Sequence, residues 1–326
     1  MTRRPAGEGP AAPDGRRPGR AARARARRLP PPLPQREGLD PIHVRAPRPG
    51  PALEILASRL PALLAPGATD LSLRFARGEI VRADASVLAA DTPIHEGEEI
   101  WLHRELAPED VPDIPLPILL QDAHLLVLDK PHDMATMPRG AHILASALVR
   151  LRRLTGIETL TPLHRLDRRT AGVLAFGIRP QERAAYQGLF ARGEVTKEYR
   201  ARVHAPPGEM PVVGERFTMR DRLVRERGML QTRVEPGEPD AFTEVQVLDA
   251  ADGFLDLALL PRTGRTHQLR VQLSHRGMPI LGDDLYPRVR RPGPADPPLA
   301  LLSRRLAFTD PITGQRRELL STRRVP

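Results

Sequence analysis

The sequence predicts an α+β protein whose larger domain is built on a largely antiparallel mixed sheet. Short apolar runs of strand length are separated by connections of unequal kind, without the regular alternation of strand and helix that parallel sheets require. No internal repeat is visible. At 326 residues the chain is long enough for one large domain or two ordinary ones.

The first 50 residues predict a basic, disordered N-terminal arm. They contain 12 Arg and only four acidic residues, so they carry +8 of the formal net charge of +10. With 11 Pro and six Gly, they hold too few apolar residues to form a core. Two interpretations stay open: the arm tethers a nucleic-acid backbone, or it is a solvated tail whose arginines reflect a biased genome.

Residues 51–104 predict a small domain, because an apolar helical stretch at 53–64, interrupted by a proline, precedes a β-like run at 99–102. Residues 105–117 hold four Pro and four acidic residues, which predicts a linker. The larger domain then spans 118–326.

The larger domain is expected to begin with a strand at 124–129, whose continuous apolar run indicates burial on both faces. Helices are expected at 142–153 and 181–192, stopped by Gly156 and Gly193. Further along, the pattern predicts strands near 171–176, 195–204, 241–249 and 253–260, a helix from Thr266 to Arg276, and a proline-rich insertion at 287–298.

The composition excludes several classes of site. The chain has no Cys, which removes disulfides, thiol nucleophiles, thiolate zinc sites and iron–sulfur clusters, and is compatible with a reducing cytosol. No stretch of about 18 uncharged apolar residues exists, and no apolar core follows the basic N-terminus. We therefore expect a cytoplasmic protein with no spanning helix and no secretory signal, and its positive charge favours a polyanionic partner.

Residues 164–170 form an unusually highly charged stretch of the chain. In the stretch His164-Arg165-Leu166-Asp167-Arg168-Arg169-Thr170, one carboxylate stands among three arginines and a histidine. Such surroundings keep a carboxylate ionised, which suits a nucleophile or an electrostatic partner and does not suit a general acid. The alternative from these residues alone is a structural loop held by ion pairs.

A second cluster, Gly264-Arg265-Thr266-His267-Gln268-Leu269-Arg270, follows the end of an expected strand. Thr266 is placed as the N-cap of the next helix, so that His267 and Arg270 lie three residues apart on one face. Taken singly, this cluster also fits an ordinary surface helix.

Together the two clusters resemble the signature blocks of RluA-type RNA pseudouridine synthases, HRLDxxTSG and GRTHQ(I/L)R. Three further blocks occur in the family's order: residues 129–136 resemble its opening strand and turn, 197–199 its KxY block, and 277–286 its G-x-P-(I/V)-x-GD…Y continuation. The resemblance covers about residues 117–320. The chain has only two lysines, and both fall inside matched blocks.

The resemblance implies a role for each matched residue. Asp167 is implied to be the catalytic carboxylate, Arg270 to pair with it, and Tyr199 to lie against the uracil ring as a candidate for the late proton removal. Arg165 is implied to fill the space that a flipped nucleotide leaves in the RNA stack. The remaining implied RNA-binding residues are Arg168, Arg169 and Arg265 at phosphates, Lys130 and Lys197 in the matched blocks, and His164 and His267, which hold loop geometry.

The implied function is isomerisation of uridine to pseudouridine in ribosomal or transfer RNA by a monomer with no cofactor and no metal. The implied fold is a pseudouridine synthase catalytic domain, with residues 51–104 as a divergent RNA-binding-like domain. The chain departs from the family pattern at Ala171, where Ser is usual, at Asp310, where His is common, and in 287–298.

Two alternatives stay open. A non-catalytic RNA-binding or ribosome-assembly factor would have the same fold without turnover. A nucleoside hydrolase or glycosidase would cleave the base without rejoining it, but such enzymes use paired carboxylates or a metal, and we expect no second acid near Asp167.

Overall fold

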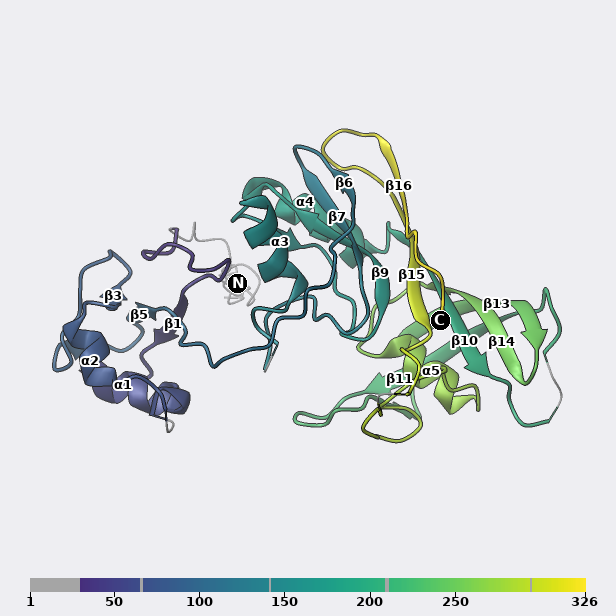
Figure 1. Cartoon of the computed structure of the whole chain (residues 1–326), viewed down its shortest axis with the longest axis horizontal. Coiled ribbons are helices and arrows are strands. Elements are labelled where there is room, and N and C mark those ends of the chain that lie inside the picture. The colour runs from purple at the N-terminus through teal and green to yellow at the C-terminus, as the bar shows by residue number, and fades with distance from the viewer. Residues whose placement is uncertain (1–29, 65–66, 141, 209–210, 294) are drawn as a thin grey trace, which may run out of the picture. The chain divides into compact units, whose positions relative to one another are not determined.

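The computed structural model describes residues 30–64, 67–140, 142–208, 211–293 and 295–326 (Figure 1). The first 29 residues of the predicted arm lie outside the described residues. The chain forms two compact units, one of them containing Asp40–Glu105 and the other containing Gln35–Leu39 and Leu106–Pro326. None of the helices in the described ranges is long and apolar enough to cross a membrane.

In its described residues, the smaller unit has a three-stranded and a two-stranded antiparallel sheet and two short α-helices. Its elements are β1 (Ile42–Arg45), β2 (Gly50–Pro51), α1 (Ala52–Arg59), the 3₁₀ helix Pro61–Leu64, α2 (Leu71–Ala76), β3 (Ile80–Arg82), β4 (Pro93–Ile94) and β5 (Glu99–Leu102). The prediction that residues 1–50 form one unfolded arm is therefore wrong at its C-terminal end. β1 pairs with β5, and Val44 and Ala46 are buried in the core of the unit while Ile42 packs against it, so alternating apolar residues give this short segment a buried face.

The larger unit is built on an 11-stranded sheet, in the order β12-β11-β13-β14-β10-β15-β9-β7-β6, with β16 paired to β15 and β8 to β9. The strands are β6 (Ile118–Gln121), β7 (Leu125–Lys130), β8 (Thr161–Pro162), β9 (Ala171–Gly177), β10 (Thr196–His204), β11 (Arg216–Val224), β12 (Arg233–Glu235), β13 (Ala241–Ala251), β14 (Phe254–Pro261), β15 (Leu301–Thr309) and β16 (Arg316–Leu320). Every described pair is antiparallel except β9 with β15. The predicted α+β class with a largely antiparallel mixed sheet is confirmed.

In the described ranges this unit has three α-helices: α3 (Ala147–Thr155), α4 (Arg183–Arg192), which follows the 3₁₀ helix Pro180–Glu182, and α5 (Gln268–His275). Gly156 and Gly193 end α3 and α4 in the left-handed conformation, with φ of 69° and 72°, as predicted.

Two predicted helix starts are wrong. The helix expected at 142–153 begins at Ala147, because the Glu109 carboxylate accepts the backbone N–H groups of the residues before it, at 2.7–3.1 Å from Ile143, Leu144 and Ala145. The helix expected from Thr266 begins at Gln268, and His267 is its N-cap. His267 has a positive φ of 56°, so the chain turns sharply before α5.

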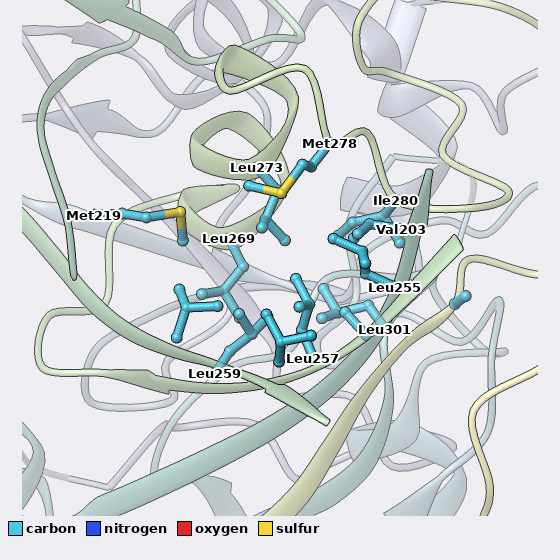
Figure 2. Packing of buried hydrophobic residues seen from close by; sticks show 14 of the residues in the cluster. Val203, Met219, Leu255, Leu257, Leu259, Leu269, Leu273, Met278, Ile280 and Leu301 are labelled. Carbon is cyan, nitrogen blue, oxygen red and sulfur yellow. The ribbon is translucent and has the colours of Figure 1, made fainter. Parts of the chain in front are cut away.

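Helix α5 is anchored to the sheet by the main core of the larger unit (Figure 2). Leu269 and Leu273 of α5 pack against Val203 of β10 and against Leu257 and Leu259 of β14, and all five are buried. Burying an aliphatic side chain of this size stabilises a fold by about 1.5–3 kcal/mol. The start of α5 is thereby fixed close to the end of β14.

Gly172 joins the charged loop 164–170 to the sheet at the parallel β9–β15 pair. It has a φ of 106°, and a Cβ atom there would lie 2.2 Å from the carbonyl oxygen of Ser303. Both the conformation and the close approach of the two backbones therefore require glycine.

We expect Gly172→Ala to lower the free energy of unfolding by more than about 3 kcal/mol, because the backbones must separate. Gly214→Ala is the matched control: Gly214 has a φ of 90°, and no atom lies within 4 Å of its Cβ position. It should lose only about 1–2 kcal/mol, from backbone strain alone. Denaturant unfolding of both variants measures the difference, and equal losses would contradict the argument.

Candidate active site

A cavity of about 700 Å³ in the larger unit collects most of the residues singled out in the sequence. Its wall is formed by the loop before β9, the end of α4, the start of β10 and the connection from β14 to α5. The lining residues are 163–167, 170, 190–193, 197, 199, 240, 261–270 and 301. The volume lies within the range of small-ligand pockets and suits a nucleotide.

Asp167 lies in this cavity with its side chain 22% exposed. Its Oδ2 is 3.8 Å from Arg270 Nη1, and its Oδ1 is 4.0 Å from His267 Nε2. Within the described ranges, neither of its carboxylate oxygens accepts a hydrogen bond. The carboxylate is thus close to a permanent cation while its oxygens stay available to a ligand.

The main partner of Arg270 is a residue that the sequence analysis did not single out. Its Nε is 2.8 Å from Asp283 Oδ2 and its Nη2 is 2.5 Å from Asp283 Oδ1, while Asp284 Oδ1 lies 2.9 Å from Nη2. Burial opposes the charge of Arg270, but the hydrogen bond and charge of Asp283 outweigh this and raise its pKa above the ordinary value. The predicted pairing with Asp167, at 3.8 Å, is therefore the longest of the three carboxylate contacts that Arg270 makes in the described ranges.

The expectation that no second acid lies near Asp167 is wrong, since Asp283 and Asp284 contact the same guanidinium. Asp283 is nonetheless engaged: its side chain is 1% exposed, and it also accepts the backbone N–H groups of Leu285 and Tyr286. It does not form the open pair of carboxylates that glycosidases use. In the parts of the chain that the structure describes, no group of three or more His, Asp or Glu side chains could hold a metal ion.

Tyr199 stands on β10 at a register shift of the strand pair, half-buried, and it lines the cavity. Burial raises its pKa to about 12, and the negative charge of Asp167 adds to the shift. The phenol is therefore protonated at neutral pH.

The two histidines of the motifs both line the cavity, and each ring is held by a hydrogen bond within the fold. His267 Nδ1 is 3.1 Å from Tyr286 Oη, which in turn accepts the backbone N–H of Thr232. His164 Nε2 accepts the backbone N–H of Ala175 at 3.1 Å, and its ring stacks on Phe190 with centroids 5.0 Å apart. Both contacts fix the ring positions, which supports a role in loop geometry.

His164 gives the fold a pH dependence. Burial lowers its pKa to about 3, so the folded protein holds a neutral ring where the unfolded chain, with an ordinary pKa of about 6.5, takes up a proton. Its stabilising effect is thus complete above pH 6.5 and is lost as the pH falls toward 3. Between pH 6.5 and 4.5, the wild type should lose about 2 kcal/mol more unfolding free energy than His164→Gln, which keeps an acceptor but does not titrate. Denaturant unfolding across this range tests it, and parallel pH profiles would contradict it.

Three of the predicted RNA contacts are exposed enough to meet a nucleic acid. Arg165 is exposed on the cavity wall, and no hydrogen bond or ion pair involves its side chain in the described ranges. Arg265 is 53% exposed and pairs with Asp240 at 2.8 Å. Arg168 is 38% exposed and pairs with Asp133 at 3.1 Å, outside the cavity wall.

Lys197, like Arg165 and Arg265, is a predicted contact that lies on the cavity side. It lines the cavity, its Nζ donates to the Thr263 carbonyl at 3.3 Å, and burial lowers its pKa. One long hydrogen bond leaves this ammonium group free to bind a further acceptor.

Lys130 and Arg169 are buried, and the prediction that they contact RNA is wrong. Lys130 is fully buried, with Nζ donating to the carbonyls of Pro131, Met134 and Arg168, and burial lowers its pKa to about 7. Arg169 is 6% exposed and donates to the Gly282 carbonyl at 3.0 Å. Both side chains brace the charged loop from inside, where no phosphate can reach them.

Comparison with known proteins gives a consistent result. A family model described as RNA pseudouridylate synthase matches residues 124–275, which include Asp167, Tyr199 and Arg270. The dual-specificity RNA pseudouridine synthase RluA of Escherichia coli is 33% identical over 209 residues, which are 61% of this chain and 89% of that protein. The uncharacterized RNA pseudouridine synthase YjbO of Bacillus subtilis is 30% identical over 206 residues, 62% of this chain and 70% of that protein.

Among solved structures, human RNA pseudouridylate synthase domain containing 1 has a TM-score of 0.53 at 24% identity, over 67% of this chain and 86% of that chain. That likeness concerns the fold. The sequence identity to RluA over most of its length, together with a cavity that unites the motif residues, means that this chain belongs to the RluA-type family of RNA pseudouridine synthases and is an isomerase acting on RNA.

Proposed function

We propose that the enzyme modifies specific uridines of structured ribosomal or transfer RNA by taking each target base out of its helix and into the cavity beside Asp167. The observation that carries this is one cavity of about 700 Å³ lined by Asp167, Tyr199 and Arg270. A stacked base is out of reach of a carboxylate, so the base must be extruded at a cost of about a few kcal/mol.

The reaction breaks the bond between N1 of uracil and C1′ of ribose, forms a bond from C5 to the same C1′, and moves one proton from C5 to N1. Asp167 starts it as an anion, either by attacking or by deprotonating the ribose. Both routes need the negative charge that Arg270 stabilises at 3.8 Å. In either case the protonated Tyr199 lies against the ring of the uracil.

Cations on the cavity wall bind the RNA around the open site. Arg165, exposed on the wall, suits the space left by the flipped nucleotide because its planar guanidinium stacks on neighbouring bases. Lys197 and Arg265 are placed to bind phosphates, and their contacts offset part of the unstacking cost.

The smaller unit is proposed to act as an RNA-binding-like domain of a monomeric, cytoplasmic enzyme. Its helix α2 is capped by Asp70, whose carboxylate accepts the N–H groups of Ser72 and Leu73. Removing this unit should weaken RNA binding while leaving the cavity of the larger unit unchanged.

The test is product formation on defined RNA pools. The full-length protein is incubated with ribosomal RNA and with transfer RNA from a strain that lacks the gene, and new pseudouridines are mapped by chemical labelling and mass spectrometry. We expect product at a few defined uridines. Tight binding without product in both pools would indicate a non-catalytic RNA-binding factor, and release of free uracil would indicate a hydrolase.

A further inference from the structure

Besides Arg165, three other exposed arginines line the cavity in the described ranges, and each of these is paired with a carboxylate. The side chains of Arg192, Arg262 and Arg265 are 59%, 67% and 53% exposed. Of these, only Arg265 belongs to a motif described above. The other two were not predicted to contact RNA.

Each pair has hydrogen-bond geometry. Arg192 binds Glu194 through two nitrogens, at 2.6 and 2.8 Å. Arg262 contacts a single oxygen of Glu244, Oε1, through Nε at 2.9 Å and Nη2 at 2.8 Å. Arg265 binds the carboxylate of Asp240 through Nη2 at 2.8 Å and its backbone carbonyl through Nε at 3.3 Å. The carboxylates of Glu194 and Glu244 are each 48% exposed.

The three arginines gather on one side of the cavity, although they come from different connections. Arg192 ends α4, Arg262 directly follows β14, and Arg265 precedes α5. The end of α4 meets the end of β14, since the Cβ position of Gly193 is 4.0 Å from the carbonyl oxygen of Arg262. Lys197 joins the same side through Thr263. We call this set, Arg192, Lys197, Arg262 and Arg265, the basic rim.

We infer that Arg192 and Arg262 bind backbone phosphates of the RNA, and that Glu194 and Glu244 occupy these arginines until the RNA displaces them. The inference rests on the proposed function, because it places the RNA backbone at the cavity. Guanidinium groups bind phosphates and carboxylates with the same two-pronged geometry, so the two anions compete for one site. Exposed ion pairs contribute about 0–1 kcal/mol, so an RNA phosphate can displace them at little cost.

Because Glu194 and Glu244 must be displaced before phosphates can bind, they lower the affinity for RNA and make it depend on how the phosphates are placed. An RNA that presents phosphates at the right positions compensates for each broken pair, whereas an RNA that presents only one does not. Each carboxylate therefore lowers the affinity for all RNA, and it lowers the affinity for poorly fitting RNA the most.

The experiment compares Glu194→Gln and Glu244→Gln with Glu318→Gln, a matched control that adds the same charge. Glu318 is 49% exposed and pairs with Arg305 on the β15–β16 hairpin, away from the cavity. Dissociation constants for total transfer RNA are measured at several salt concentrations. Each rim variant should bind about two- to fivefold more tightly than the control, the range expected for one exposed ion pair. The slope of log affinity against log salt concentration should also steepen by as much as about 0.7–0.9. In the wild type, the carboxylate displaced by RNA takes up a cation and offsets part of the cation release from the RNA, whereas the glutamine of the variant takes up none.

A double-mutant cycle identifies the arginine as the site. In an Arg192→Gln background, Glu194→Gln should no longer raise affinity above the control, because the competed site is gone. Equal gains with and without Arg192, or gains no larger than that of Glu318→Gln, would overturn the inference. Pseudouridine formation by the wild-type protein is measured with the same transfer RNA as the binding constants. If the wild type makes pseudouridine while the rim variants bind RNA no more tightly than the control, the inference of competition at Arg192 and Arg262 is wrong, but the proposed function is still supported.

Discussion

Asp167→Asn should remain folded and bind RNA while its turnover falls by at least about 10³-fold, the scale seen when a reacting group is removed. The substitution preserves shape and removes only the negative charge. Because the carboxylate is partly exposed and accepts no hydrogen bond in the described part of the chain, its loss leaves no buried partner unsatisfied. Arg270 keeps Asp283 and Asp284, so the wall of the cavity should not move.

RNA affinity should be equal or higher, because a negative charge has been removed from a site that meets a polyanion. Asp133→Asn is the matched control. Asp133 pairs with Arg168 at 3.1 Å, lies outside the cavity wall and has a positive φ of 57°, a conformation that asparagine tolerates well. It should keep turnover within a few-fold of the wild type. Product mapping, filter binding and thermal unfolding are measured on both, and detectable turnover in Asp167→Asn would remove this residue from its role.

The sequence predicted the residues that meet at the cavity better than it predicted how they are held. Ordered motifs brought Asp167, Tyr199 and Arg270 into one expected site, and the structure places all three on one cavity wall. The principal partner of Arg270 is Asp283, 13 residues away across a turn, and such a contact depends on tertiary packing. The signal was present as two adjacent acids, Asp283 and Asp284, inside a matched block.

The resemblance implied RNA contacts for two cations that the fold buries. A charged residue is almost never fully buried unless it is paired, and the sequence does not show which groups partner Lys130 and Arg169. In the structure Lys130 donates to three backbone carbonyls, whereas Arg169 donates to one carbonyl and lies 3.6 and 3.5 Å from the carboxylates of Asp133 and Asp284. The carbonyls exist in every sequence, and only the folded chain shows which of them converge on an ammonium or guanidinium group.

Arg270→Met should destabilise the protein by about 3–5 kcal/mol, because it leaves the carboxylate of Asp283 buried without its partner. The Asp283 side chain is 1% exposed and that of Arg270 is 4% exposed. Arg202→Met is the control: Arg202 binds Asp256 with the same two-pronged geometry, at 2.7 and 2.8 Å, but its side chain is 42% exposed. It should lose less than about 1 kcal/mol. Denaturant unfolding measures the loss of unfolding free energy in both variants. Similar losses would show that burying the Arg270 pair does not increase its contribution to stability.

The double variant Arg270→Met/Asp283→Asn separates the two roles of Arg270. Removing both charges eliminates the unpaired buried carboxylate, and the side-chain amide oxygen introduced by Asp283→Asn can still accept the N–H groups of Leu285 and Tyr286. Much of the lost unfolding free energy should therefore return. Turnover should stay low, because Asp167 has lost the cation 3.8 Å away that stabilises its charge, and this effect does not depend on Asp283. Recovery of stability together with activity would mean that Arg270 serves only the fold, whereas recovery of stability alone assigns it to the chemistry of Asp167.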